Sequence, residues 1–141
     1  MRAMQVTELG KPLILQEVPQ PVAAAGEVVV KVHTCGLNFG DTLAIKGTYQ
    51  ERPALPFTLG MELCGTITEV GAGVEGFVPG QRVAAYCGFG AMADYAALPA
   101  NICVPIPDAM TAEHAAAFLI TYGTSHVALD YKAKMQKGER L

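Results

Sequence analysis

Two segments decide the fold of this chain: Cys35-Gly-Leu-Asn-Phe-Gly-Asp-Thr-Leu-Ala-Ile-Lys-Gly-Thr-Tyr49 and Leu59-Gly-Met-Glu-Leu-Cys-Gly65. They connect the strand-like run Val28-Val-Val-Lys-Val32 to a short helix and then to a glycine-rich return into sheet. Polar side chains gather at these junctions within an otherwise apolar region. Because binding groups concentrate at element ends held by a rigid scaffold, we interpret the junctions as one wall of an active-site cleft. The other wall is expected to lie outside this chain.

The composition is that of one globular domain, with 141 residues of which 51% are hydrophobic and 16% charged. The 15 glycines and 9 prolines favour a turn-rich β architecture over a helical bundle. A net charge of −3 argues against nucleic acid as a partner. The sequence also lacks a lysine-rich run of the kind that binds an anionic membrane surface. The four cysteines contain no C-x-x-C pair. With no signal-peptide pattern, we expect a cytoplasmic protein with reduced, mostly buried thiols.

Short strands separated by turn signals are predicted over residues 2–9, 13–18, 27–34, 63–70, 81–86 and 91–98. Their spacing favours a small barrel or sandwich. Asn38 is a predicted N-cap for a helix over 39–46, with Gly47 just beyond its end. Two further helices are expected over 112–118, with Thr111 as N-cap, and over 122–135.

An ordered set of motifs runs along almost the whole chain. It comprises Asn38/Asp41, Gly47/Tyr49, Leu59 to Val74, Pro79 to Val83, Gly90/Ala93/Tyr95, Ile120 to Leu129 and Lys137-Gly-Glu139. The set resembles the medium-chain dehydrogenase/reductase superfamily. The resemblance implies a mainly β (α+β) fold: a GroES-like, partly open β-barrel over residues 1–120. A helix over 121–141 would then lead toward a Rossmann nucleotide-binding domain that is missing from this sequence.

Two positions separate this chain from the zinc-dependent alcohol dehydrogenases that it resembles. Those enzymes carry a cysteine ligand where Asn38 stands and a histidine ligand where Met61 stands, and Zn²⁺ requires thiolate, imidazole or carboxylate donors. Gly40 also lacks the hydroxyl that zinc enzymes place there. We therefore predict no metal, and the pattern resembles the zinc-independent NADPH:quinone oxidoreductase branch.

That resemblance implies the N-terminal catalytic-domain fragment of an NADPH-dependent quinone oxidoreductase, inactive as this fragment alone. Hydride would pass from NADPH to a quinone or another conjugated carbonyl, and NADP(H) would be bound mainly by the absent domain. The matching residues that border the nicotinamide are Asn38, Asp41, Tyr49 and Thr124. No catalytic residue is assigned, because the cofactor carries the chemistry. The resemblance also implies a quinone or enone substrate and a homo-oligomeric full-length form.

The four residues suit different contacts. Asn38 and Thr124 can hydrogen bond to a carboxamide or ribose, and Tyr49 can stack on or donate to a flat acceptor. Asp41 would repel phosphates, so we expect it to orient a neighbour.

Residue type alone also favours structural roles for several of these positions. Asn38 is a natural N-cap, Asp41 a surface acid in a first helical turn, and Glu62 a residue that holds a turn or a buried pair. Glycines at 71, 73, 80 and 90 are expected to serve turns with positive φ, and the four cysteines to be small core residues.

Two other functions stay open. One is an enoyl-CoA or enone reductase of the same superfamily. The other is a non-catalytic GroES-like binding module, because the same barrel is seen in a co-chaperonin.

Overall fold

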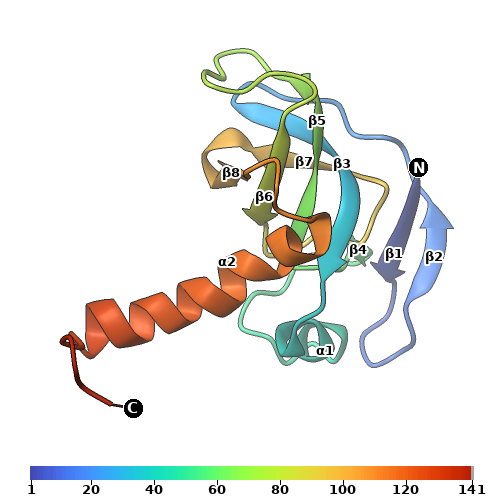
Figure 1. Ribbon diagram of the computed structural model, residues 1–141. Helices are drawn as coiled ribbons and strands as arrows, with labels where there is room; N and C mark the ends of the chain where they lie inside the picture. Colours follow the sequence, from blue (N-terminus) through green and yellow to red (C-terminus); the bar gives the residue numbers. More distant parts are fainter. Residues whose placement is uncertain (141) are drawn as a thin grey trace.

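Within residues 1–140, which the computed structural model describes, eight strands form two antiparallel sheets with two α-helices beside them (Figure 1). One sheet has the order β2-β1-β4 and the other β7-β3-β5-β6-β8. In this part of the chain the sheets do not close into a barrel, which confirms the mainly β, partly open architecture. The strands are β1 (Arg2–Val6), β2 (Ile14–Glu17), β3 (Glu27–Gly36), β4 (Phe57–Thr58), β5 (Glu62–Val70), β6 (Arg82–Tyr86), β7 (Tyr95–Pro99) and β8 (Cys103–Pro105).

The strand predictions are correct for the longer elements and fail for the shortest. β1 and β2 form the expected hairpin, with Arg2 opposite Glu17. β4 and β8 were not predicted, since two or three residues are too few to show an alternating pattern. β7 begins at Tyr95 rather than at residue 91, because the N–H groups of Ala91 and Met92 donate to the carbonyls of Gly60 and Leu59 instead of to a strand ladder.

The main core lies under the paired strands β3 and β5. Val28, Val30, Leu63 and Ile67 are all 1% exposed or less. β3 and β5 pass so close together that a Cβ on Gly65 would overlap the backbone carbonyl of Lys31. The pair therefore requires a residue without a side chain at this crossing.

One of the four predicted turn glycines has a different reason to be glycine. Gly73, Gly80 and Gly90 have positive φ as expected. Gly71 does not; a Cβ there would overlap the carbonyl oxygen of Ala24. Close backbone approach, rather than backbone conformation, determines that position.

Helix α1 (Phe39–Ile45) begins at the predicted residue and ends one residue before the predicted end, because Lys46 is its C-cap. Asn38 is its extended N-cap, with φ −123° and ψ 153°, and Gly47 follows the helix with φ +69°. The helix begins shortly after β3 ends, so it lies beyond the end of that strand of the large sheet (Figure 1).

The C-terminal helices differ from the prediction. One continuous helix, α2 (Ala112–His126), replaces the two expected segments and continues as a π-helical segment, η2 (Val127–Lys132). The expected gap over residues 119–121 is helical, and no proline interrupts the helix. The predicted domain boundary at residue 120 lies inside α2, and the division into domains stays a prediction.

The first half of α2 is anchored on the sheet, and the second half projects away from it (Figure 1). Ala115 and Ala116 are buried against Cys64 and Ala84. The Arg82 guanidinium fixes the loop before the helix by donating to the carbonyl oxygens of Asp108 at 3.1 Å and Met110 at 2.7 Å. Among residues 1–140, no helix is long and apolar enough to cross a membrane.

Candidate functional site

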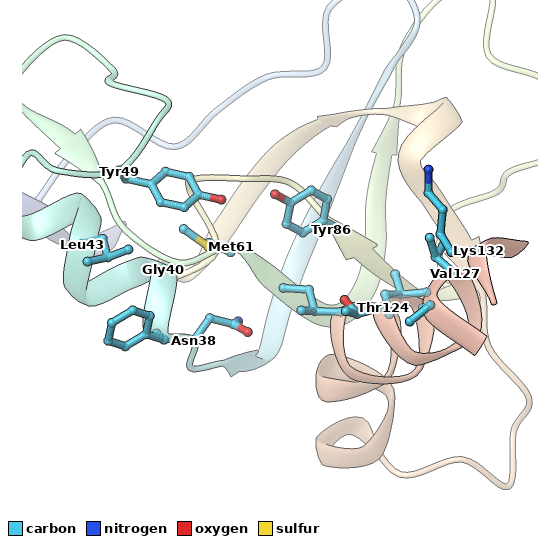
Figure 2. A pocket seen from close by; sticks show the side chains of 14 residues that line it. Asn38, Gly40, Leu43, Tyr49, Met61, Tyr86, Thr124, Val127 and Lys132 are labelled. Carbon is cyan, nitrogen blue, oxygen red and sulfur yellow. The ribbon is translucent and has the colours of Figure 1, made fainter. Parts of the chain in front are cut away.

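The largest pocket described for the molecule, about 810 Å³, lies between α1 and the second half of α2 (Figure 2). It combines an apolar lining with a few hydroxyl and amide groups, as ligand pockets commonly do. Its polar side chains come from both walls and from the strand ends between them. The lining residues are Asn38, Phe39, Gly40, Leu43, Tyr49, Met61, Tyr86, Leu119, Ile120, Gly123, Thr124, Val127, Ala128 and Lys132.

Asn38 reaches this pocket because it caps α1. The Asp41 carboxylate accepts a hydrogen bond from the backbone N–H of Asn38 at 2.8 Å, the reciprocal contact of a capping box. The Asn38 side chain donates from Nδ2 to Oε1 of Glu62 at 3.0 Å. The N-cap role and a position in the pocket lining therefore coexist in the same residue.

Asp41 occupies a different place from the other three candidates. It does not line the pocket and is buried behind it, 4% exposed, so the expectation of an exposed helix-turn acid is wrong. Burial raises its pKa, while the backbone N–H groups of Asn38 and Gly60 act in the opposite direction. Its contact with Asn38 agrees with the expectation that Asp41 orients a neighbour.

Tyr49 faces a second tyrosine that sequence reasoning missed. The hydroxyls of Tyr49 and Tyr86 point toward each other across the pocket mouth (Figure 2). Burial and then the Tyr49 hydroxyl raise the pKa of Tyr86. Tyr86 ends strand β6, and that position, an aromatic hydroxyl at a strand terminus, was the available signal. The Tyr49 ring is held edge-on to Phe89, with ring centroids 6.4 Å apart.

Gly40 and Met61 form an apolar floor at the positions that separate this chain from the zinc enzymes. A Cβ on Gly40 would lie 2.6 Å from Cε and 2.8 Å from Sδ of Met61. Met61 thus occupies the space into which a side chain at residue 40 would project. Residues 1–140 contain no group of three or more His, Cys, Asp or Glu side chains placed to hold a metal ion. Metal independence stays a prediction.

The opposite wall of this pocket is supplied by α2 and η2, so the expectation that the other wall lies outside this chain is wrong for the pocket described here. Thr124 points toward Asn38 from α2, and Lys132 lies farther along on η2 (Figure 2). Lys132 is the one basic side chain among the lining residues that the structure describes. The donor set fits the amide and ribose end of a nicotinamide nucleotide better than its phosphates, for which a helix N-terminus or several basic groups are the usual partners.

All four cysteines are free, and those at 64 and 103 are buried as expected. Burial, followed by the nearby Asp41 and Glu62 carboxylates, raises the pKa of Cys35 to about 12. Burial also raises the pKa of Cys87 to about 12 and that of Cys103 to about 11. These thiols are therefore unsuited to act as nucleophiles at neutral pH.

Comparison with known families agrees with this geometry. The alcohol dehydrogenase GroES-like domain matches residues 24–108. This chain belongs to the alcohol dehydrogenase GroES-like domain family. The resemblance to the medium-chain dehydrogenase/reductase superfamily is thereby confirmed.

Several relatives of this GroES-like chain carry quinone oxidoreductase names. It is 44% identical to mouse quinone oxidoreductase-like protein 2 over 139 residues, covering 98% of this chain and 39% of the relative. A Thermus thermophilus quinone oxidoreductase, solved also in complex with NADPH, is 37% identical with a TM-score of 0.86; the match covers 99% of this chain and 43% of that one. The human synaptic vesicle membrane protein VAT-1 homolog-like protein is 32% identical with a TM-score of 0.94. That match covers 98% of this chain and 45% of the human one.

The GroES-like chain thus spans about two fifths of the length of the first of these relatives. The comparisons place it in a family of oxidoreductases. The pocket brings Asn38, Tyr49 and Thr124 together and leaves Asp41 behind its wall. Their contacts with a cofactor belong to the proposal that follows.

Proposed function

We propose that this chain forms the substrate-side half of an NADPH-dependent quinone oxidoreductase. The observation that carries the proposal is the pocket in which Asn38 and Thr124 lie on opposite walls beneath a pair of tyrosine hydroxyls. The quinone oxidoreductase names of the relatives and the NADPH complex of one structural neighbour support it. In this proposal residues 1–120 are the GroES-like domain and 121–141 lead into a nucleotide-binding domain.

Asn38 and Thr124 are proposed to hold the carboxamide and ribose of the nicotinamide. Both side chains can donate and accept hydrogen bonds, and both border an otherwise apolar pocket where such bonds orient a ligand. Asp41 supports this wall through the Asn38 backbone and does not touch the ligand. When bound, NADPH supplies the hydride.

Tyr49 and Tyr86 are proposed to receive the carbonyl end of the acceptor. Their hydroxyls meet at the pocket mouth, where either can donate to an oxygen that gains negative charge during reduction. The apolar floor formed by Gly40 and Met61 suits the flat ring of a quinone. No metal is required, because hydrogen-bond donors stabilise the developing charge.

The activity test compares two lengths of the protein. A chain extended through a nucleotide-binding domain is expected to oxidise NADPH with 1,4-benzoquinone, whereas the 141-residue chain alone is expected to show little NADPH affinity. In the extended protein, Asn38→Ala should lower kcat/KM about tenfold through loss of an oriented hydrogen bond. The exposed Asn101→Ala is the matched control. Tight NADPH binding by the short chain would contradict the proposal.

Two alternatives make different predictions in the same assay. An enone or enoyl-CoA reductase would turn over an enoyl thioester faster than benzoquinone. A GroES-like binding module would oxidise NADPH with neither acceptor and would form rings detectable by light scattering. We further propose a cytoplasmic location and a homo-oligomeric full-length form. Size-exclusion chromatography with light scattering would test the oligomeric state.

A further inference from the structure

Glu62 is a buried acidic side chain that the proposed function leaves without a role. It begins β5, is 2% exposed and does not line the pocket. A Cβ on Gly36 would overlap its carboxylate, so the facing strand β3 leaves room for it. A buried carboxylate is costly unless it is hydrogen bonded, and its partners therefore indicate what it does.

Both oxygens of Glu62 accept a hydrogen bond, and the two donors come from opposite walls of the pocket. Oε1 accepts from Nδ2 of Asn38 at 3.0 Å, and Oε2 accepts from the backbone N–H of Ile120 at 3.4 Å. Asn38 precedes α1, whereas Ile120 lies in α2, four residues before Thr124 and on the same helix face. Glu62 is thus the link between the two walls.

The chemistry of a carboxylate makes this link directional. A carboxylate accepts hydrogen bonds and cannot donate, so the Asn38 amide must turn its NH2 group toward Glu62. The carbonyl oxygen of Asn38 is then on the side of the amide away from Glu62, where it can accept from the backbone N–H of Asp41 in the capping box, and Asn38 lines the pocket in that one orientation. Without Glu62, the amide could turn over and exchange donor for acceptor.

We propose that Glu62 is a positioning residue that fixes the orientation of the Asn38 amide and its location relative to Thr124 on α2. The consequence for ligand recognition rests on the proposed function, in which Asn38 and Thr124 hold the nicotinamide. The positioning itself does not depend on which ligand binds.

Glu62→Gln separates orientation from packing because it preserves the shape of the side chain. A glutamine offers one acceptor and one donor, while both partners at this position are donors. The backbone N–H of Ile120 cannot turn, but the Asn38 amide can. We therefore expect the introduced glutamine to accept from Ile120 and to donate to an inverted Asn38.

Nuclear magnetic resonance on the isotope-labelled 141-residue chain tests the link without any ligand. The wild type should show a through-hydrogen-bond coupling between the Asn38 side-chain nitrogen and the Glu62 carboxyl carbon. Glu62→Gln should abolish that coupling and shift the Asn38 NH2 signals. Glu69→Gln on the exposed part of β5 should leave both unchanged. Unchanged Asn38 signals in Glu62→Gln would overturn the proposal.

A complementary pair of variants covers the case in which Glu62→Gln folds poorly. Asn38→Asp alone places two carboxylates together and should lower the free energy of unfolding. Adding Glu62→Gln should recover much of that loss, because the introduced glutamine can donate to the introduced aspartate and still accept from Ile120. Strictly additive effects of the two changes would show that the side chains are not coupled and would contradict the link.

Titration of the protein extended through a nucleotide-binding domain with NADPH separates this inference from the proposed function, because the extended protein is the form expected to bind the nucleotide. If both are correct, Glu62→Gln weakens binding about tenfold, as expected for one misdirected hydrogen bond. If the coupling is present but the wild type does not bind the nucleotide, the positioning stands and the cofactor assignment fails. If the nucleotide binds equally to wild type and Glu62→Gln, the positioning role is wrong.

Discussion

The Asp41 carboxylate shows how one residue can serve the site without entering it. Oδ2 accepts from the Asn38 backbone, whereas Oδ1 is buried and has no hydrogen-bond partner in residues 1–140. An incompletely bonded, buried carboxylate is destabilised in its charged form, and this raises its pKa. Capping of α1 is therefore achieved at some cost in stability when Asp41 is ionised.

This cost predicts a pH dependence. Because the folded-state pKa of Asp41 is raised above its ordinary value of 3.8, the folded chain holds the proton more tightly than the unfolded chain. Its contribution to the free energy of unfolding should fall as pH rises from 3.8 through the raised pKa. Urea unfolding of wild type and Asp41→Asn should reveal that fall as a difference, since asparagine has no such titration.

Asp94→Asn is a control in which the free energy of unfolding should depend on pH in the opposite direction. Hydrogen bonds from Arg2 lower the pKa of Asp94, so its stabilising contribution is lost as pH falls rather than as pH rises. A difference between wild type and Asp41→Asn that does not vary with pH would show that Asp41 is not perturbed in the folded chain.

The cysteines give a second prediction at the scale of single residues. Burial raises the pKa of all four thiols, so few thiolates exist at about pH 8. We expect iodoacetamide to label the native chain slowly at that pH and to label all four cysteines in denaturant, as measured by mass spectrometry. Rapid native labelling at one cysteine would identify a thiol whose environment differs from the one described.

At the scale of elements, the contact between β3 and β5 depends on a missing side chain. Gly65→Ala would bring a Cβ against the Lys31 carbonyl, and neither backbone can move without disturbing the sheet. We expect a loss of about 3 kcal/mol in the free energy of unfolding, the upper range for overpacking. Gly123→Ala in α2 is the matched comparison, because a Cβ there meets nothing within 4 Å. It should be neutral or stabilising by up to about 1 kcal/mol.

Helix α2 begins at the cap that its sequence predicts. The Thr111 side chain accepts from the backbone N–H of His114 at 3.3 Å. Thr111→Ala should lower the free energy of unfolding by about 1 kcal/mol, whereas Thr111→Ser should retain most of it. Thermal unfolding followed by circular dichroism would measure both, and equal losses in the two variants would indicate that the hydroxyl is not the stabilising group.

The same helix shows where local signals reach their limit. Thr111 and Asn38 could be recognised as caps because capping depends on residues three positions apart. The continuity of α2 through Gly123 could not, since a glycine within a helical pattern is compatible with either a break or a continuous helix. In the structure the first half of α2 packs against Cys64 and Ala84, and the helix continues through Gly123 without a break.

At the scale of the whole molecule, the two walls of the pocket come from segments far apart in the sequence, represented by Asn38 and Thr124. The sheet brings them together, since β3 delivers α1 to one side and the Arg82-anchored loop delivers α2 to the other. This arrangement leaves Tyr122 and Tyr131 exposed on the projecting helix.

The metal content is a prediction for the whole folded chain. Asn38 and Met61 offer no thiolate or imidazole at the pocket, and Met61 fills the space beside Gly40. A chelated, desalted preparation should contain far less than one zinc per chain by elemental analysis, and added zinc should leave the thermal midpoint unchanged. Stoichiometric zinc would contradict the assignment to the zinc-independent branch.

The sequence by itself determined the strand-rich architecture, the caps of both helices and the resemblance that led to Asn38, Tyr49 and Thr124. These follow from periodicity, from short-range capping patterns and from motifs in a fixed order. Only the tertiary structure decided that Asp41 is buried behind the wall, that Tyr86 faces Tyr49, and that Glu62 joins Asn38 to α2. The physical reason is that burial and hydrogen-bond partners depend on which distant strands pack together, and no local pattern records that.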